Sequence, residues 1–147
     1  MTFISRKPKP IFRPGGIKII KVLSETKSIR RVSSKILNSL SGHRLDRDKL
    51  FDVKLCVEEA VRNAIVHGNR SNKKLYVRVR YRIDKDKIGI EIEDEGKGFD
   101  HERIPYPTHK DNIMKLSGRG VYLMRHLMDE IKFNAKGNQV RFVKYLK

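Results

Sequence analysis

Alternating apolar positions predict two neighbouring β-strands in the middle of the chain. Apolar side chains occupy every second position over residues 75–83 and again over residues 88–92, which is the period of a strand with one buried face. Turn residues 84–87 lie between the two runs, so we expect the strands to pair antiparallel. The other face of the first run is predicted to point outward, and it carries Arg78, Arg80 and Arg82.

Three segments show the apolar spacing of a helix. Residues 26–40 and 48–67 each place apolar side chains along one side of a helix. Gly68 follows the second segment and is predicted to end it as a left-handed cap. A shorter helix is predicted over residues 121–128, after a long loop at residues 95–117 that is rich in glycine, proline and charge.

Further strands are predicted at residues 17–23, 130–134 and 139–146, the last two flanking a turn at Lys136-Gly137. The elements together indicate an α+β fold, a two-layer α/β sandwich in which helices cover one face of a largely antiparallel sheet. The proline-containing, basic residues 1–16 are expected to form an arm ahead of a single domain over residues 17–147.

Composition and charge narrow the class of protein. Of the 147 residues, 38% are hydrophobic and 35% charged, and no apolar run suits a signal peptide or a membrane span. The single cysteine, Cys56, and the histidines lack zinc-site spacing, so we expect a cytoplasmic protein without a structural metal. The net charge of +17 would attract phosphates, nucleic acid, anionic lipid or acidic proteins, and charge alone does not choose among them.

The helix predicted over residues 48–67 carries the first candidate site. Glu59 and Asn63 are one turn apart on the same side of this helix, between apolar neighbours. A carboxylate can accept a proton and an amide oxygen can ligate magnesium. The alternative is a buried, mutually satisfied polar pair.

Asp94 is the second candidate. It continues the inward-facing positions of the strand at residues 88–92, just before the chain reaches Gly96 and Gly98. A buried, unpaired carboxylate is costly, but a flat apolar ligand with an amino group, such as adenine, would satisfy it. The alternative is a carboxylate that caps its own turn.

A third candidate is the sequence Gly118-Arg119-Gly120 directly before Val121, where the last helix is predicted to begin. Free N–H groups at a helix start, with glycines that remove side-chain obstruction, form a phosphate site. Short glycine pairs before helices are frequent, so this feature alone is a weak indication.

In combination, the three candidates resemble the GHKL (Bergerat-fold, HATPase_c) ATPase superfamily. Residues 58–68 look like its asparagine box, residues 94–100 like its first glycine box, and residues 118–124 with 127–130 like its second. The amino-acid sequences of these boxes and the compact length of the chain most resemble the anti-sigma-factor serine/threonine-protein kinases. The resemblance covers residues 17–147.

This resemblance implies ATP and Mg²⁺ as cofactors. It makes Glu59 the general base, Asn63 the metal ligand and Asp94 the acceptor for adenine. The remaining nucleotide-binding residues that it implies are Gly96, Gly98, Gly118, Arg119, Gly120 and Val121. Many members of the family also bind adenine through a threonine in the last hairpin, where this chain has Asn138 and Gln139.

The resemblance also implies a transcription regulator that phosphorylates a serine or threonine on a STAS-domain anti-anti-sigma protein. The same family sequesters a sigma factor and is usually homodimeric. Two alternatives stay open: a catalytically inactive binding module switched by nucleotide, and a basic nucleic-acid-binding protein. No membrane partner is expected.

Overall fold

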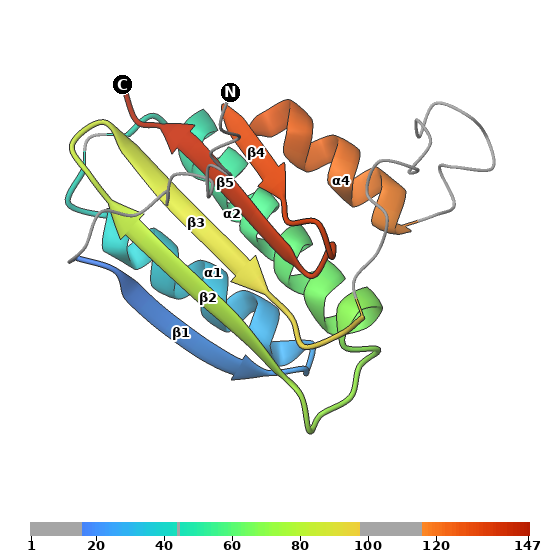
Figure 1. Ribbon diagram of the computed structural model, residues 1–147. Helices are drawn as coiled ribbons and strands as arrows, with labels where there is room; N and C mark the ends of the chain where they lie inside the picture. The colour runs from blue at the N-terminus through green and yellow to red at the C-terminus, as the bar shows by residue number, and fades with distance from the viewer. Residues whose placement is uncertain (1–15, 44, 98–115) are drawn as a thin grey trace, which may run out of the picture.

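Helices cover one face of an antiparallel sheet (Figure 1). The computed structural model describes residues 16–43, 45–97 and 116–147, with side chains from residue 120 onward in the last range. The elements are, in chain order, β1 (Lys18–Leu23), α1 (Lys27–Leu40), α2 (Arg47–Asn63), the π-helical turn η1 (Ala64–Gly68), β2 (Tyr76–Ile83), β3 (Lys87–Glu93), α4 (Leu116–Leu127), β4 (Glu130–Phe133) and β5 (Gln139–Tyr145). The predicted α+β sandwich is confirmed.

The sheet has five strands in the order β1-β2-β3-β5-β4, and all neighbours pair antiparallel. The predicted alternation sets the register between β2 and β3, where Val79 lies opposite Ile92 and Tyr81 opposite Ile90. All four side chains are buried. Helix and sheet therefore meet along the inward positions that the two-residue period predicts.

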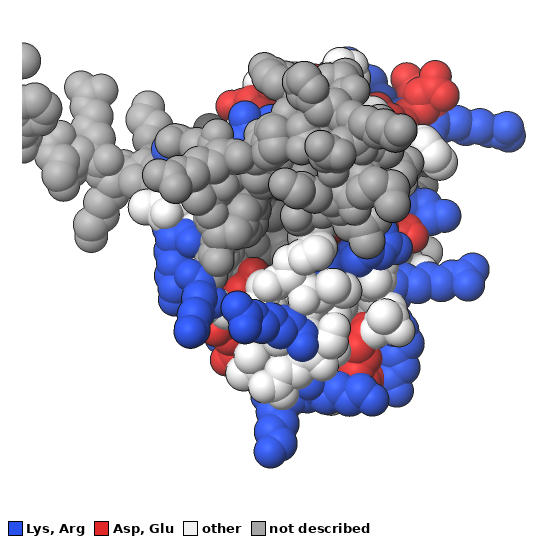
Figure 2. All heavy atoms as spheres, turned by 90° about the vertical axis from the view of Figure 1, so that its right-hand side faces the viewer, with Lys and Arg blue, Asp and Glu red and all other residues white. Residues whose placement is uncertain are grey.

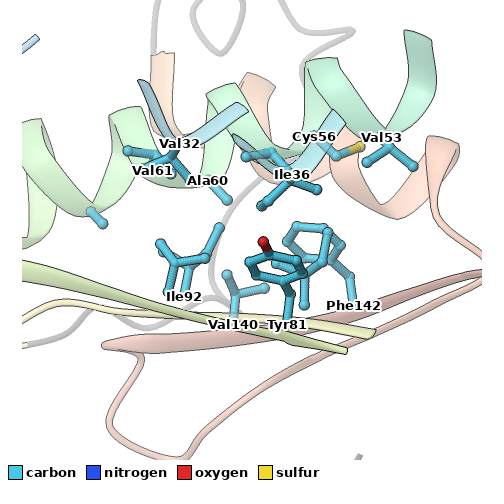
Figure 3. Close-up of a cluster of buried hydrophobic side chains, with 14 of the residues drawn as sticks. Val32, Ile36, Val53, Cys56, Ala60, Val61, Tyr81, Ile92, Val140 and Phe142 are labelled. Atoms are coloured by element: carbon cyan, nitrogen blue, oxygen red, sulfur yellow. The ribbon is translucent and has the colours of Figure 1, made fainter. Parts of the chain in front are cut away.

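The hydrophobic core fills the space between the helices and the sheet (Figure 3). Val32 and Ile36 of α1 and Val61 of α2 point towards Tyr81 and other side chains of the sheet. Burial of each side chain of this size stabilises the folded state by roughly 1.5–3 kcal/mol relative to leaving it exposed. None of the helices in the described part of the chain combines the length and apolar character needed to cross a membrane.

Cys56 belongs to this core and is fully buried on α2. Burial and, to a lesser extent, the nearby Asp52 carboxylate together raise the pKa of its thiol to about 12. The interpretation of Cys56 as a small buried hydrophobe agrees with its place in the core.

The predicted end of the second helix is wrong in its geometry. The α-helix ends at Asn63 and continues as the π-helical turn η1. Gly68 is not in the left-handed region; instead Arg70 and Ser71 have φ angles of 51° and 56°. The chain therefore reverses two residues later than the glycine signal predicts.

The outward face of the sheet carries a buried acidic residue. Glu91 of β3 is only 5% exposed, because Arg80 and Arg141 form ion pairs with it at 3.6 and 3.0 Å. The amide of Gln139 also donates to the Glu91 carboxylate. Arg80 thus lies on the outward face, as predicted, and pairs there with Glu91.

Candidate functional site

A pocket opens between the end of α2, the end of β3, α4 and the β4–β5 hairpin. Two of the residues selected from the sequence, Asn63 and Asp94, line it. The remaining lining residues are Ala60, Ala64, Gly68, Ile92, Met124, Phe133, Gly137, Asn138, Gln139 and Val140. The lining is therefore mostly apolar with a few polar groups, as in most small-molecule sites.

Asp94 is the buried acceptor of this pocket. The residue is only 8% exposed, and within the described part of the chain its carboxylate accepts one hydrogen bond, from the Gly96 N–H to Oδ1 at 2.8 Å. Burial raises the pKa of this carboxyl group to about 6, and the Gly96 hydrogen bond opposes that rise. A ligand that donates a hydrogen bond to Asp94 would recover part of the lost solvation.

Two glycines allow the backbone to close around Asp94. A Cβ atom on Gly68 would lie 2.2 Å from the Asp94 Oδ2 atom, and one on Gly96 would lie 1.9 Å from the Gly68 carbonyl oxygen. Neither position has room for a side chain. The predicted use of Gly96 in a close turn agrees with this geometry, whereas Gly98 lies outside the described residues.

Glu59 and Asn63 meet α4 at Gly120. A Cβ atom on Gly120 would lie 2.6 Å from Glu59 Oε2 and 3.0 Å from Asn63 Nδ2. The other oxygen of the Glu59 carboxylate accepts from Arg62 Nη1 at 3.0 Å. The structure thus brings together the acid, the amide and a glycine of the third sequence motif, and Glu59 is paired with a cation rather than with Asn63.

The predicted start of the last helix at Val121 is wrong. The helix α4 begins at Leu116, inside the segment predicted as a loop. The N–H groups without intrahelical acceptors belong to the first four residues of a helix. Here these residues are 116–119, which include Gly118 and Arg119 but not Gly120 or Val121.

Val121 also differs from its predicted role. Its side chain is 2% exposed and belongs to the hydrophobic core, and the residue does not line the pocket. Gly120 serves close packing of α4 against Glu59 and Asn63 instead of offering a free N–H group. The rest of the loop at residues 98–115 lies outside the described residues.

Two asparagines hold the Asp94 turn; the sequence analysis missed Asn69, and it named Asn138 only as a departure from the family. Asn69 accepts the Glu95 N–H at Oδ1 (2.8 Å). On the other side, Asn138 donates from Nδ2 to the Asp94 carbonyl oxygen at 3.1 Å, and its own carbonyl oxygen accepts the Asp94 N–H. Both contacts join residues far apart in the sequence, so no local period indicates them.

A model of the histidine kinase-like ATPase domain family matches residues 22–144. The serine-protein kinase RsbW of Bacillus subtilis is 35% identical over 106 residues, which cover 67% of this chain and 66% of its own length. RsbW of Staphylococcus aureus is 32% identical over 68% of each chain. RsbW of Listeria innocua is 30% identical over 81% of this chain and 79% of its own.

A crystal structure of the RsbU and RsbW domains of a Mycobacterium tuberculosis protein has the same fold. It superimposes with a TM-score of 0.61 at 15% identity, covering 91% of this chain and 33% of that chain. The chain spans about two thirds of the length of the first curated relatives it matches.

Proposed function

Because this chain belongs to the histidine kinase-like ATPase domain family, in the branch of the RsbW serine-protein kinases, we propose that it binds ATP and phosphorylates a protein serine or threonine. The observation that carries the proposal is the pocket in which Asn63 and the buried Asp94 face one space. Asn63 in turn shares a contact with Glu59 at Gly120.

Asp94 and its apolar surroundings suit the adenine base. The carboxylate accepts hydrogen bonds when ionised, and adenine offers an amino group on a flat apolar ring. Ile92, Met124 and Val140 provide apolar pocket walls against which such a ring can pack. This assignment puts the base at the end of β3 and the phosphates nearer to α4.

Glu59 is the residue we assign to proton transfer. The hydroxyl oxygen of the acceptor serine or threonine forms a bond to the γ-phosphorus, the bond from that phosphorus to the β,γ-bridging oxygen breaks, and ADP leaves. The hydroxyl proton passes to the Glu59 carboxylate. A side chain 21% exposed at the edge of α2 is accessible to a hydroxyl group from a partner.

Asn63 would hold Mg²⁺ through its carboxamide oxygen, since amide oxygens are suitable magnesium ligands. Magnesium, when bound, neutralises charge on the phosphates. We assign phosphate binding to the backbone N–H groups of Gly118 and Arg119, which lie in the first turn of α4.

The partners we propose follow from the family alone. They are a STAS-domain anti-anti-sigma protein as the phosphate acceptor, a sigma factor as the sequestered protein and a second copy of this chain as a homodimer. The net charge of +17 favours acidic partner surfaces.

The test separates binding from chemistry. Glu59→Gln keeps the shape of the side chain and removes the base, so phosphate transfer should fall about 100-fold to 10,000-fold while ATP affinity stays within a few-fold. Asn63→Ala should instead lose most of the Mg-ATP affinity. The measurements are transfer of labelled γ-phosphate to the STAS-domain protein that co-purifies from the native host, and calorimetric ATP titration of the same variants.

The controls decide between an enzyme and a binding module. Glu58→Gln changes the neighbouring carboxylate on the same helix and should transfer phosphate at the parent rate. Equal transfer by the parent and Glu59→Gln would remove Glu59 as the base. If the parent binds ATP but transfers no phosphate to its partner, the chain is a nucleotide-switched binding module.

A further inference from the structure

The loop after η1 supplies a buried side chain that no part of the proposed chemistry uses. Asn69 is 2% exposed, and its carboxamide makes three hydrogen bonds. Oδ1 accepts the Glu95 N–H at 2.8 Å, while Nδ2 donates to Ser24 Oγ at 2.8 Å and to the Tyr76 carbonyl oxygen at 2.9 Å.

The orientation of this carboxamide is fixed by its partners. The Glu95 N–H group can only donate, and the Tyr76 carbonyl oxygen can only accept. In a flipped amide, Nδ2 would face the Glu95 N–H, donor against donor, and Oδ1 would face the Tyr76 carbonyl oxygen, acceptor against acceptor. Asn69 has one satisfactory arrangement, and in that arrangement its oxygen points at the residue directly after Asp94.

The contacts of Asn69 join four parts of the fold. Ser24 follows β1, Tyr76 begins β2, Glu95 follows β3, and Asn69 itself follows η1. A second bond reinforces the junction, because the Glu95 carboxylate accepts the Tyr76 N–H at 2.6 Å. The chain around Asp94 is thus tied to the sheet through Asn69 on one side and, through the Asn138 contacts, on the other.

The neighbouring glycine shows how closely the two segments fit. Gly68 precedes Asn69, and a Cβ atom there would meet both carboxylate oxygens of Asp94 at less than 3 Å. Movement of the Gly68–Asn69 segment would consequently displace the carboxylate. A buried amide with all of its bonds made resists such movement, since each broken bond would leave a polar group unpaired.

We propose that Asn69 is a positioning residue for nucleobase selectivity: by holding the Glu95 amide, it fixes the Asp94 carboxylate where it accepts the amino group of adenine and repels the carbonyl oxygen of guanine. The inference rests on the proposed ATP site. A carboxylate free to shift would bind adenine less well and exclude guanine less strictly. The wrong base is rejected because it leaves a buried polar group of the site unpaired, and a group that can move away avoids that cost.

The experiment compares ADP with GDP, each with Mg²⁺, by calorimetry. Asn69→Ala should weaken ADP binding and lower the ratio of the GDP to the ADP dissociation constant, each by about tenfold, the factor for one hydrogen bond of typical strength. General loss of stability would lower the melting temperature of the variant but would leave the ratio unchanged. If Asn69→Ala does not fold in buffer, parent and variant are both measured in trimethylamine N-oxide, which favours the folded state.

Two matched variants serve as controls. Asn72→Ala removes an asparagine from the same loop, whose side chain makes an exposed contact to the Lys74 N–H, and should bind both nucleotides as the parent does. Ser24→Ala removes a buried partner of Asn69 but leaves the Glu95 contact. It should therefore lower the melting temperature but leave the ratio of the GDP to the ADP dissociation constant close to that of the parent.

The outcomes separate this inference from the proposed function. If the parent shows no preference for ADP, or if Asp94→Asn keeps that preference, the nucleotide site itself is wrong and the role of Asn69 falls with it. If Asp94→Asn loses the preference but Asn69→Ala keeps the parent ratio, only the positioning role of Asn69 is overturned.

Discussion

At the scale of single residues, Asp94 is a site where binding and stability oppose each other. Its carboxyl group has a pKa of about 6 in the folded protein against the ordinary 3.8, chiefly because of burial. The folded state therefore holds this proton more tightly than the unfolded chain. Stability from this group is fully present below about pH 4 and is lost as the pH rises through about 6.

We predict that Asp94→Asn stabilises the nucleotide-free protein at pH 7. The gain in the free energy of unfolding should approach about 3 kcal/mol, the equivalent of the pKa shift, and should vanish below about pH 4. Urea unfolding of both proteins between pH 4 and pH 8 measures it. Asp86→Asn, at an exposed ion pair, is the control and should change stability by less than about 1 kcal/mol. An Asp94→Asn variant that is less stable than the parent at pH 7 would contradict the prediction.

Sequence reasoning identified the residues whose placement follows from a local period. Asp94 continues the two-residue alternation of β3, and Glu59 and Asn63 are one helical turn apart, so their faces could be predicted. Asn69 and Asn138 act through partners 26 and 44 residues away. Such contacts depend on how strands are placed next to one another, which a single sequence does not encode in its local pattern.

At the scale of elements, the start of α4 was the main error. Short glycine pairs before a helix are frequent, and the prediction followed that pattern, yet Gly118 and Gly120 are inside α4. Packing against α2 outweighs the low helix propensity of glycine here, because a residue without Cβ lets α4 approach the side chains of Glu59 and Asn63 without moving them. The strands, in contrast, were predicted within a residue or two, since β2 and β3 show a clear alternation of apolar side chains and turn residues bound the shorter strands.

Two glycine substitutions should differ in their effect on stability. In Gly96→Ala the new methyl group meets the Gly68 backbone oxygen, which cannot rotate away, so the free energy of unfolding should fall by about 1–3 kcal/mol. In Gly120→Ala it meets the end of the Glu59 side chain, which can move. Helix propensity favours alanine by about 0.5–1 kcal/mol, so the stability of Gly120→Ala should change little.

Gly120→Ala should nevertheless lose phosphate transfer, because the displaced Glu59 carboxylate no longer occupies its place next to Asn63. Denaturant titration and the transfer assay on both variants measure the two effects. Parent-like transfer by Gly120→Ala would show that the position of Glu59 against α4 does not matter for the reaction.

At the scale of the whole molecule, charge is distributed unevenly. Many acidic side chains pair with cations, such as Glu91 with Arg80 and Arg141. On the face in Figure 2, lysine and arginine side chains project around an area of uncharged residues, with acidic groups next to some of them. Helix α1 contains no acidic residue at all. The resulting field attracts anions in general, nucleotides included, and weakens as salt rises.

The order of the strands does not follow from the local sequence pattern. The period of apolar residues predicts that β2 pairs with β3 and β4 with β5, since short turns join them. It does not predict that β5 inserts between β3 and β4, because that contact closes a loop of more than forty residues. The family match to residues 22–144 agrees with the three motifs from which the resemblance was inferred.

The reaction of the buried Cys56 thiol with a dye can measure how often the protein core opens. A thiol-specific dye reacts with the thiolate, and this thiol is both inaccessible and held protonated by a pKa of about 12. Dye should therefore attach only during openings of the core, far more slowly than in denaturant. A nucleotide that binds only the folded state should slow attachment by the factor one plus its concentration divided by its dissociation constant. The rate of colour development would then report affinity without any partner protein, whereas dye uptake by the folded chain at the denatured rate would contradict the burial of Cys56.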